Sequence, residues 1–156
     1  MKNKGRLISM DVAEWKLEEF KTRARRAGVH NFETRTIESP KSIKRLHETA
    51  DRLLLDVPCS GLGVLKRNPD ARWKLKPEYI TKIRNTQQAI LNDYALMVKP
   101  GGKLVYSTCS ILPSENEKQV KQFLDQHSSF QLEEELTIKP SLLTDGFYMA
   151  RIKRLA

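Results

Sequence analysis

Cysteine and histidine are scarce in this sequence, and their scarcity excludes two kinds of site. The 156 residues include two cysteines and three histidines. Two cysteines cannot form the dense disulfide framework of a small secreted domain. No Cys-x-x-Cys pair or histidine cluster has the spacing of a zinc site, so no metal site is expected. Each thiol is therefore expected to be free, either as a small buried side chain or as a reactive group.

Long apolar runs are missing as well. No stretch approaches the length of a membrane-spanning helix, and residues 1–5 lack the apolar core of a signal peptide. These features predict a cytoplasmic protein with reduced thiols and no membrane partner. A chain of 156 residues, 39% hydrophobic and 30% charged, suits one globular domain and is short for two. We therefore expect residues 1–156 to form a single domain.

Negative charge is in the minority. Lysine and arginine number 28 against 19 acidic residues, and the resulting net charge of +9 favours an acidic partner such as a nucleic acid. Residues 66–84 form a basic segment in which only Asp70 and Glu78 oppose the positive charges. Its basic residues are Lys66, Arg67, Arg72, Lys74, Lys76, Lys82 and Arg84. A solvated surface is the alternative interpretation of such a segment.

Strand and helix patterns alternate along the chain. Strand-like runs are expected at residues 6–10, 32–37, 52–56, 103–108 and 146–153. Helical spacing predicts helices at residues 15–27, 42–49, 77–98 and 115–127. This order predicts an α/β fold with a mostly parallel sheet and helices on both faces. Ser114 and Glu117 have the spacing of a capping box for the last helix, and residues 99–102 (KPGG) are expected to end the third.

Polar or reactive side chains follow several of these strands. Asp11 follows the first run, where it could bind a ribose or cap the next helix. Asp56 and Cys59 follow the third run, and Cys109 follows the fourth. Because open α/β folds place their sites at the carboxyl edge of the sheet, both cysteines are expected to belong to one site there.

The two cysteine motifs resemble those of the RNA cytosine-5 methyltransferases, which include the bacterial Sun/Fmu ribosomal RNA enzymes and the eukaryotic Nop2/NSUN proteins. The matching segments are residues 56–63 (DVPCSGLG), 67–70 (RNPD), 99–102 (KPGG), 107–110 (STCS), 113–117 (PSENE) and 145–147 (DGF). The resemblance covers nearly the whole chain. It implies a Rossmann-like class I methyltransferase fold that uses S-adenosylmethionine.

The resemblance also implies roles for individual residues. Cys109 would be the nucleophile that adds to carbon 6 of cytosine, because carbon 5 is not nucleophilic enough to take a methyl group unaided. Cys59 would assist resolution of the covalent adduct, and Asp56 would hydrogen-bond the cytosine edge near N3 and the amino group. Asp11 matches the acid that binds the cofactor ribose, Glu38 lies near the position that contacts adenine, and Asp56 borders the cofactor as well.

The substrate implied by the resemblance is RNA, with ribosomal RNA favoured over transfer RNA. Lys66, Arg67 and Arg72 are the candidate RNA contacts, since they follow directly on the first cysteine motif. A solvated basic surface remains the alternative for these three side chains.

One feature of the family is not found in this sequence: the first strand and the glycine-rich turn that holds the cofactor. We therefore expect an N-terminally shortened catalytic domain that binds S-adenosylmethionine poorly unless a dimer or a preceding segment completes the pocket. The rival interpretation is a non-catalytic RNA-binding remnant of such an enzyme. The missing turn favours the remnant, whereas both cysteines and Asp56 favour the enzyme.

Overall fold

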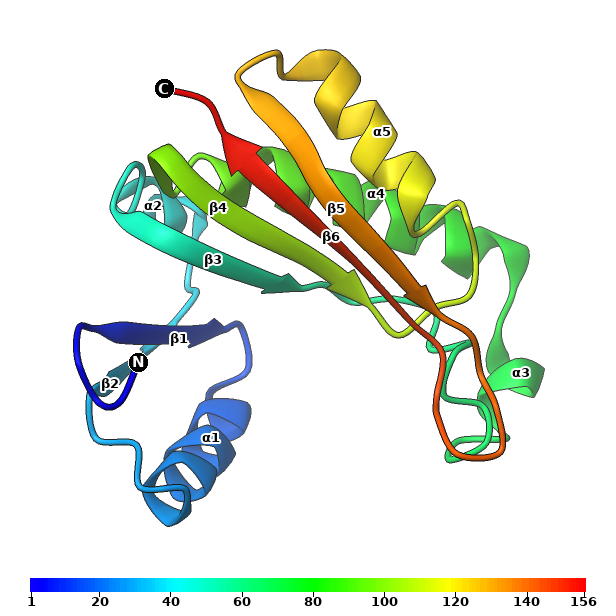
Figure 1. Ribbon diagram of the computed structural model, residues 1–156. Helices are drawn as coiled ribbons and strands as arrows, with labels where there is room; N and C mark the ends of the chain where they lie inside the picture. Colours follow the sequence, from blue (N-terminus) through cyan, green and yellow to red (C-terminus); the bar gives the residue numbers. More distant parts are fainter. The chain divides into compact units, whose positions relative to one another are not determined.

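The computed structural model describes residues 1–156, apart from the side chain of Lys74, and divides them into two compact units. Unit 1 is Met1–Arg45 and unit 2 is Leu46–Ala156 (Figure 1). Unit 1 contains β1 (Leu7–Asp11), α1 (Glu14–Arg26), β2 (Phe32–Thr36) and α2 (Pro40–Lys44). Unit 2 contains β3 (Ala50–Asp56), α3 (Ala71–Lys74), α4 (Pro77–Ala95), β4 (Val98–Thr108), α5 (Glu117–Gln126), β5 (Phe130–Ile138) and β6 (Phe147–Arg154). That residues 1–156 act as a single domain stays a prediction.

Unit 1 is a strand–helix–strand unit. β1 and β2 pair in parallel, from Leu7 opposite Phe32 to Asp11 opposite Thr36. Helix α1 connects them and buries Leu17 and Ala24. Its acidic first turn and basic last turn complement the helix dipole. The parallel pairing brings the carboxyl ends of both strands to one edge, where Asp11 lies.

Unit 2 contains a mixed sheet rather than a mostly parallel one. Its strand order is β3-β4-β6-β5, with β3 parallel to β4 and β6 antiparallel to both of its neighbours. The difference arises from β5, which the sequence pattern did not predict. The short connection from β5 to β6 forms a hairpin, because a parallel crossover needs a dozen or more residues.

One face of this sheet carries the core. Leu104 and Tyr106 of β4 are fully buried and alternate with less buried neighbours, as expected for a strand covered on one side. Leu91 of α4 and Phe123 of α5 belong to the same buried cluster. Both helices therefore pack on this face, and within unit 2 no described helix covers the second face (Figure 1).

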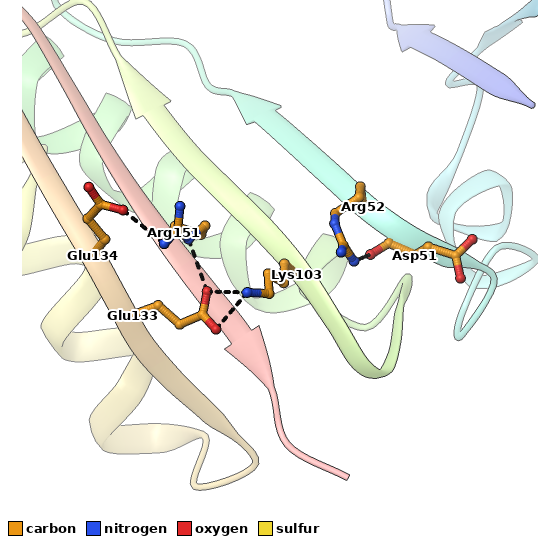
Figure 2. A network of polar contacts seen from close by, with 6 residues as sticks. All are labelled: Asp51, Arg52, Lys103, Glu133, Glu134 and Arg151. Atoms are coloured by element: carbon orange, nitrogen blue, oxygen red, sulfur yellow. Dashed lines mark hydrogen bonds and ion pairs between the residues drawn. The ribbon is translucent and has the colours of Figure 1, made fainter. Parts of the chain in front are cut away.

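The second face holds a network of ion pairs across three strands (Figure 2). The Glu133 carboxylate of β5 accepts hydrogen bonds from Lys103 of β4 at 2.8 Å and from Arg151 of β6 at 3.0 Å. Arg151 also pairs with Glu134 at 2.9 Å. Opposite charges on neighbouring strands stabilise a sheet, which explains how the acidic run of β5 forms a strand.

Three local expectations are wrong. Residues 99–102 do not end a helix: α4 stops at Ala95, and KPGG lies inside β4, where the register with β3 shifts. The expected capping box is not formed, since α5 begins after Asn116 without a side-chain cap and Ser114 instead accepts a bond from Gln119 through its carbonyl. Residues 57–76, in which glycines and prolines interrupt any regular period and predict a loop, contain the short helix α3. No helix in the described residues is long and apolar enough to cross a membrane.

Candidate active site

The two cysteines meet at the carboxyl edge of the parallel β3–β4 pair. Asp56 lies opposite Ser107 in the register, and the Val57 amide continues the pairing by donating to the Ser107 carbonyl at 3.2 Å. Cys59 and Cys109 leave the ends of these strands side by side, with their sulfur atoms 3.1 Å apart. Both are free and partly buried. The structure thus brings together the two thiols that the sequence pattern assigned to one site.

The contact between the sulfurs makes the two thiols chemically different. A hydrogen bond from the Cys59 thiol stabilises the Cys109 thiolate and lowers the pKa of Cys109 from 9.0 to about 7, although burial and the charges of Asp56 and Glu115 oppose this shift. The same hydrogen bond, together with burial, raises the pKa of Cys59. The pair is therefore poised near neutral pH as a Cys109 thiolate and a protonated Cys59.

A buried carboxylate holds the loops that carry both cysteines. Glu115 has no exposed surface. Its carboxylate accepts the Ser60 amide at 2.8 Å, the Ser110 hydroxyl at 2.8 Å and the Gln87 side-chain amide at 3.0 Å. The two serines directly follow the two cysteines, and their hydroxyls lie 3.1 Å apart. We call Glu115, Ser60, Ser110 and Gln87 the Glu115 network.

The Glu115 network is anchored in the core of unit 2. Gln87 of α4 also donates to the Pro58 carbonyl at 2.9 Å, immediately before Cys59. The buried Tyr106 hydroxyl donates to the Glu115 carbonyl at 2.7 Å. A buried carboxylate is tolerated only when it is well hydrogen-bonded, and Glu115 meets this condition. Because a fully satisfied buried network is rigid, these contacts hold the loops that carry both thiols in place.

Sequence reasoning missed the Glu115 network. Glu115 was expected inside an amphipathic helix, and a helix of that kind normally begins with an acidic residue. The usable signal was position, since Glu115 and Asn116 follow Cys109 closely. Asn116 accepts the Thr108 hydroxyl at 2.6 Å and donates to the Ser110 carbonyl at 3.0 Å, so it closes the loop around Cys109.

Gly63 allows a third segment to approach the cysteine loops. Its amide donates to the Cys109 carbonyl at 2.9 Å, and its carbonyl accepts the Gly146 amide at 2.8 Å. A Cβ atom at Gly63 would lie 2.7 Å from the Cys109 carbonyl oxygen and would collide with the Gly146 carbonyl. Only glycine fits here, and the two hydrogen bonds tie the β5–β6 connection to the site.

The expected acids occupy strand ends in both units. Asp56 ends β3, is exposed, and its charge acts on Cys109. Asp11 ends β1; its carboxylate accepts the Ala13 amide at 2.8 Å and pairs with Lys16 at 3.4 Å. Glu38 is exposed just after β2. No group of three or more potential metal ligands occurs among the described residues.

The three candidate RNA contacts are exposed but have partners within unit 2. The Lys66 ammonium donates to the Leu142 carbonyl, and Arg67 pairs with Asp145. The Arg72 guanidinium lies over the Trp73 ring, 4.4 Å from its centre. Lys66 and Arg67 therefore help to hold the β5–β6 connection against the loop that follows Cys59.

Comparison with known proteins gives consistent results. A family model described as the 16S rRNA methyltransferase RsmB/F matches residues 1–153. A probable ribosomal RNA small subunit methyltransferase B from Synechocystis is 36% identical over 99% of this chain and 39% of its own length. The corresponding probable enzyme of Bacillus subtilis is 37% identical over 84% of this chain and 30% of its own length. The chain thus spans well under half of these relatives.

Solved structures agree on the fold. The crystal structure of NSun6 from Pyrococcus horikoshii with SFG matches 99% of this chain and 42% of its own, with a TM-score of 0.85 and 28% identity. A methyltransferase homolog from the same organism matches 98% of this chain and 54% of its own, with a TM-score of 0.82 and 28% identity. The expected class I methyltransferase fold is confirmed. By the extent of the family match and the identity to its relatives, the chain belongs to the RsmB/F family of 16S rRNA methyltransferases.

Proposed function

We propose that this chain carries the catalytic thiols for methylation of carbon 5 of cytosine in RNA, through a covalent bond between Cys109 and carbon 6. The observation that carries the proposal is the 3.1 Å contact between Cys59 and Cys109, with the pKa of Cys109 lowered to about 7. A thiol with that pKa is substantially ionised at neutral pH, and the thiolate is the nucleophilic form.

The Cys109 thiolate would add its electron pair to carbon 6 of the ring. The electrons of the carbon 5–carbon 6 double bond then make carbon 5 nucleophilic, as an enamine. S-adenosylmethionine, the methyl donor of this family, would supply the methyl group that carbon 5 takes and would leave as S-adenosylhomocysteine. Transfer of the carbon 5 proton to water would return its bonding electrons to the carbon 5–carbon 6 double bond, and cleavage of the carbon 6–sulfur bond would return the other electron pair to Cys109 as the thiolate.

Cys59 would assist the step in which the bond between Cys109 and carbon 6 breaks. Its sulfur lies 3.1 Å from the Cys109 sulfur, so a protonated Cys59 can donate to the thiolate that leaves when the adduct breaks down. The raised pKa of Cys59 keeps it protonated for this purpose. A positioned thiol of this kind makes Cys59 an assistant in product release rather than the bond-forming nucleophile.

Asp56 would orient the base. Its exposed carboxylate stands at the end of β3 and is close enough for its charge to raise the pKa of Cys109. A carboxylate in that place can accept a hydrogen bond from the cytosine amino group, next to N3. Uracil offers no amino group there, so this contact would also favour cytosine.

The acids of unit 1 suit the cofactor. Asp11 and Glu38 lie at the carboxyl ends of the parallel strands β1 and β2, and the side chain of Asp11 is 29% exposed. Carboxylates at such strand ends can accept hydrogen bonds from ribose hydroxyls and adenine. We infer that a dimer or a further segment supplies the remaining cofactor contacts, and that the chain alone binds S-adenosylmethionine weakly.

Ribosomal RNA is the proposed substrate, because the family model and the curated relatives carry that substrate in their names. The net charge of +9 and the exposed basic side chains of residues 66–84 suit the phosphates of any RNA. Ribosomal RNA is favoured over transfer RNA on the names alone. A ribosomal RNA substrate would also place the activity in the cytoplasm.

The test is covalent trapping. RNA containing 5-azacytidine is incubated with the chain and S-adenosylmethionine, and a denaturing gel is examined for a protein–RNA adduct. We expect an adduct with the wild-type chain and none with Cys109→Ala. Exposed Ser128→Ala is the matched control and should trap RNA like wild type.

Failure to form an adduct would leave a different function. If the wild-type chain forms no adduct while it still binds RNA in a salt-sensitive way, the RNA-binding remnant is the correct interpretation. Calorimetry in the same buffer measures whether the chain binds S-adenosylmethionine. It therefore distinguishes a chain that fails to bind the methyl donor from one that binds it but has unreactive thiols.

A further inference from the structure

Helix α3 presents an aromatic ring to solvent. Trp73 is 76% exposed, an unusual position for the largest apolar side chain. The guanidinium of Arg72 lies over the ring, 4.4 Å from its centre. Arg72 is exposed as well, so the pair forms a flat cationic and aromatic surface that is not explained by packing within unit 2.

The segments that precede and follow α3 are both hydrogen-bonded to the cysteine loops. The preceding loop is anchored where the Gly63 amide bonds the Cys109 carbonyl. After α3 comes α4, which begins at Pro77 and is held to the site by Gln87. At about 1.5 Å of rise per residue, Pro77 lies about 15 Å along α4 from Gln87. Helix α3 therefore lies beyond the end of α4 that is distant from Gln87, and is not part of the Glu115 network (Figure 1).

The surroundings of Trp73 favour a polyanion. Exposed cationic side chains precede and follow α3, and only two exposed acidic residues oppose them in the segment. These cations are Lys76, Lys82 and Arg84, together with Lys66 and Arg67, which also hold the β5–β6 connection. A ring flanked by cations is the arrangement by which proteins hold single-stranded nucleic acids, with phosphates on the cations and a base stacked on the ring.

We propose that Trp73, backed by Arg72, is a stacking platform for one base of single-stranded RNA flanking the cytosine that reacts at Cys109. This inference rests on the proposed function for its RNA substrate and adds a positioning residue to it. A base in a duplex offers its face to neighbouring bases, so the platform would select unpaired RNA around the target.

Tryptophan emission tests the platform directly, because the chain has two tryptophans and both are exposed. Trp15→Phe leaves Trp73 as the probe, and Trp73→Phe leaves Trp15. Trp15 is a matched control, since it is 62% exposed and has the Lys16 ammonium 5.8 Å from its ring centre. Titration with an unstructured single-stranded oligoribonucleotide should quench Trp73 saturably and leave Trp15 emission nearly unchanged.

Affinity measurements separate stacking from charge. Stacking of a base on an aromatic ring contributes enough that Trp73→Ala should weaken binding of the oligoribonucleotide about 5- to 150-fold. Trp73→Phe should weaken it less. The slope of log K against log salt should stay unchanged in Trp73→Ala, whereas Lys76→Ala should reduce its magnitude by roughly 0.7 if that side chain neutralises one phosphate.

Three results would overturn the platform. They are unchanged affinity in Trp73→Ala, quenching of Trp15 instead of Trp73, and a Trp73 emission shift that depends on protein concentration without RNA, which would mean that a second copy of the chain covers the ring. The proposed function is tested by a separate measurement, the covalent adduct. Cys109→Ala should abolish the covalent adduct while retaining the Trp73 quench, so loss of one result does not imply loss of the other.

Discussion

A thiolate at neutral pH needs a source of stabilisation, and at Cys109 that source is another thiol. The Cys59 sulfur lies 3.1 Å away and lowers the pKa of Cys109 to about 7. Asp56 and Glu115 act in the opposite direction. The Cys109 thiolate therefore depends on a neutral hydrogen-bond donor and not on a nearby cation. Cys59 thus helps to form the nucleophile as well as to release it.

Replacement of Cys59 by alanine tests this dependence. The hydrogen bond that this change removes favours the charged form, so Cys59→Ala should raise the pKa of Cys109 from about 7 toward the ordinary value of 9.0. At pH 7 the thiolate fraction should fall from about half to a few per cent. The measurement is the pH dependence of iodoacetamide alkylation at Cys109, followed by peptide mass spectrometry.

A control variant should shift the pKa of Cys109 in the opposite direction. Asp56→Asn removes a negative charge that raises the pKa of Cys109, so its alkylation midpoint should move to lower pH. If Cys59→Ala leaves the midpoint in place, or moves it in the same direction as Asp56→Asn, the hydrogen bond is not what stabilises the thiolate.

The Glu115 carboxylate holds both cysteine loops through hydrogen bonds from Ser60 and Ser110. Glu115→Ala would leave the buried Ser60 amide, Ser110 hydroxyl and Gln87 amide without their acceptor, each at a substantial desolvation cost. We expect the free energy of unfolding to fall by about 3 kcal/mol or more. Urea denaturation followed by circular dichroism measures the change.

Glu117→Ala is the matched control for Glu115→Ala. Glu117 is exposed in the first turn of α5, where its favourable interaction with the helix dipole contributes about 1 kcal/mol or less. Equal losses in the two variants would mean that the Glu115 network does not stabilise the cysteine loops.

The sequence predicted the reactive residues better than their supports. Cysteines after two successive parallel strands must emerge at one edge, so Cys59 and Cys109 could be paired from pattern alone. Glu115 could not, because a buried acid and an exposed acid at a helix start have the same sequence signature. Its burial and its hydrogen bonds, both seen only in the structure, distinguish it from Glu117.

At the scale of elements, the loop after β3 is held by Gly63. Its hydrogen bonds join that loop to the Cys109 segment and to the β5–β6 connection at Gly146. The approach is too close for a side chain, since a Cβ would collide with the Gly146 carbonyl. Any residue other than glycine must push the cysteine loops apart.

Gly63→Ala should therefore destabilise unit 2 by about 1–3 kcal/mol and change the alkylation rate of Cys109. Gly101→Ala is the control. Gly101 has a φ of +76° and open space around it, so alanine there introduces backbone strain without displacing the site. A Gly63→Ala variant that alkylates at the wild-type rate would contradict the tight packing of these loops.

The bounds of most elements could be predicted, but the helix expected at residues 42–49 is the shorter α2, Pro40–Lys44, and other errors arise where tertiary contacts override local preference. β5 was missed because Glu133, Glu134 and Glu135 do not look like a strand. Its ion pairs with Lys103 and Arg151 stabilise it in place (Figure 2). The KPGG segment was assigned to a turn, but pairing with β3 draws it into β4 as an irregular stretch.

At the scale of the whole molecule, the described chain leaves strand edges open. β1 pairs only with β2, and β3 pairs only with β4, each on one edge. Leu54 of β3 is 68% exposed, although a run of three leucines is typical of a strand buried on both faces. The α/β class could be predicted from the order of elements. The division into two units could not be predicted, because it depends on which strands pair with one another by hydrogen bonds.

These open edges suit the proposal that a dimer or a further segment completes the cofactor pocket. Exposed strand edges readily accept another strand, and S-adenosylmethionine contacts beyond Asp11 and Glu38 would then come from outside the described residues. Both proposed catalytic thiols lie in unit 2.

The most direct test of the central claim is the identity of the thiol that bonds to RNA. The adduct formed with 5-azacytidine RNA in the presence of S-adenosylmethionine is digested, and the nucleotide-bearing peptide is sequenced by mass spectrometry. We predict modification at Cys109 alone, and in Cys59→Ala an adduct on ordinary RNA that forms more slowly, because less Cys109 is thiolate, and also resolves more slowly than in the wild-type chain. Modification at Cys59, or an adduct in Cys59→Ala that resolves as fast as the wild-type adduct, would contradict the proposed roles of the two cysteines.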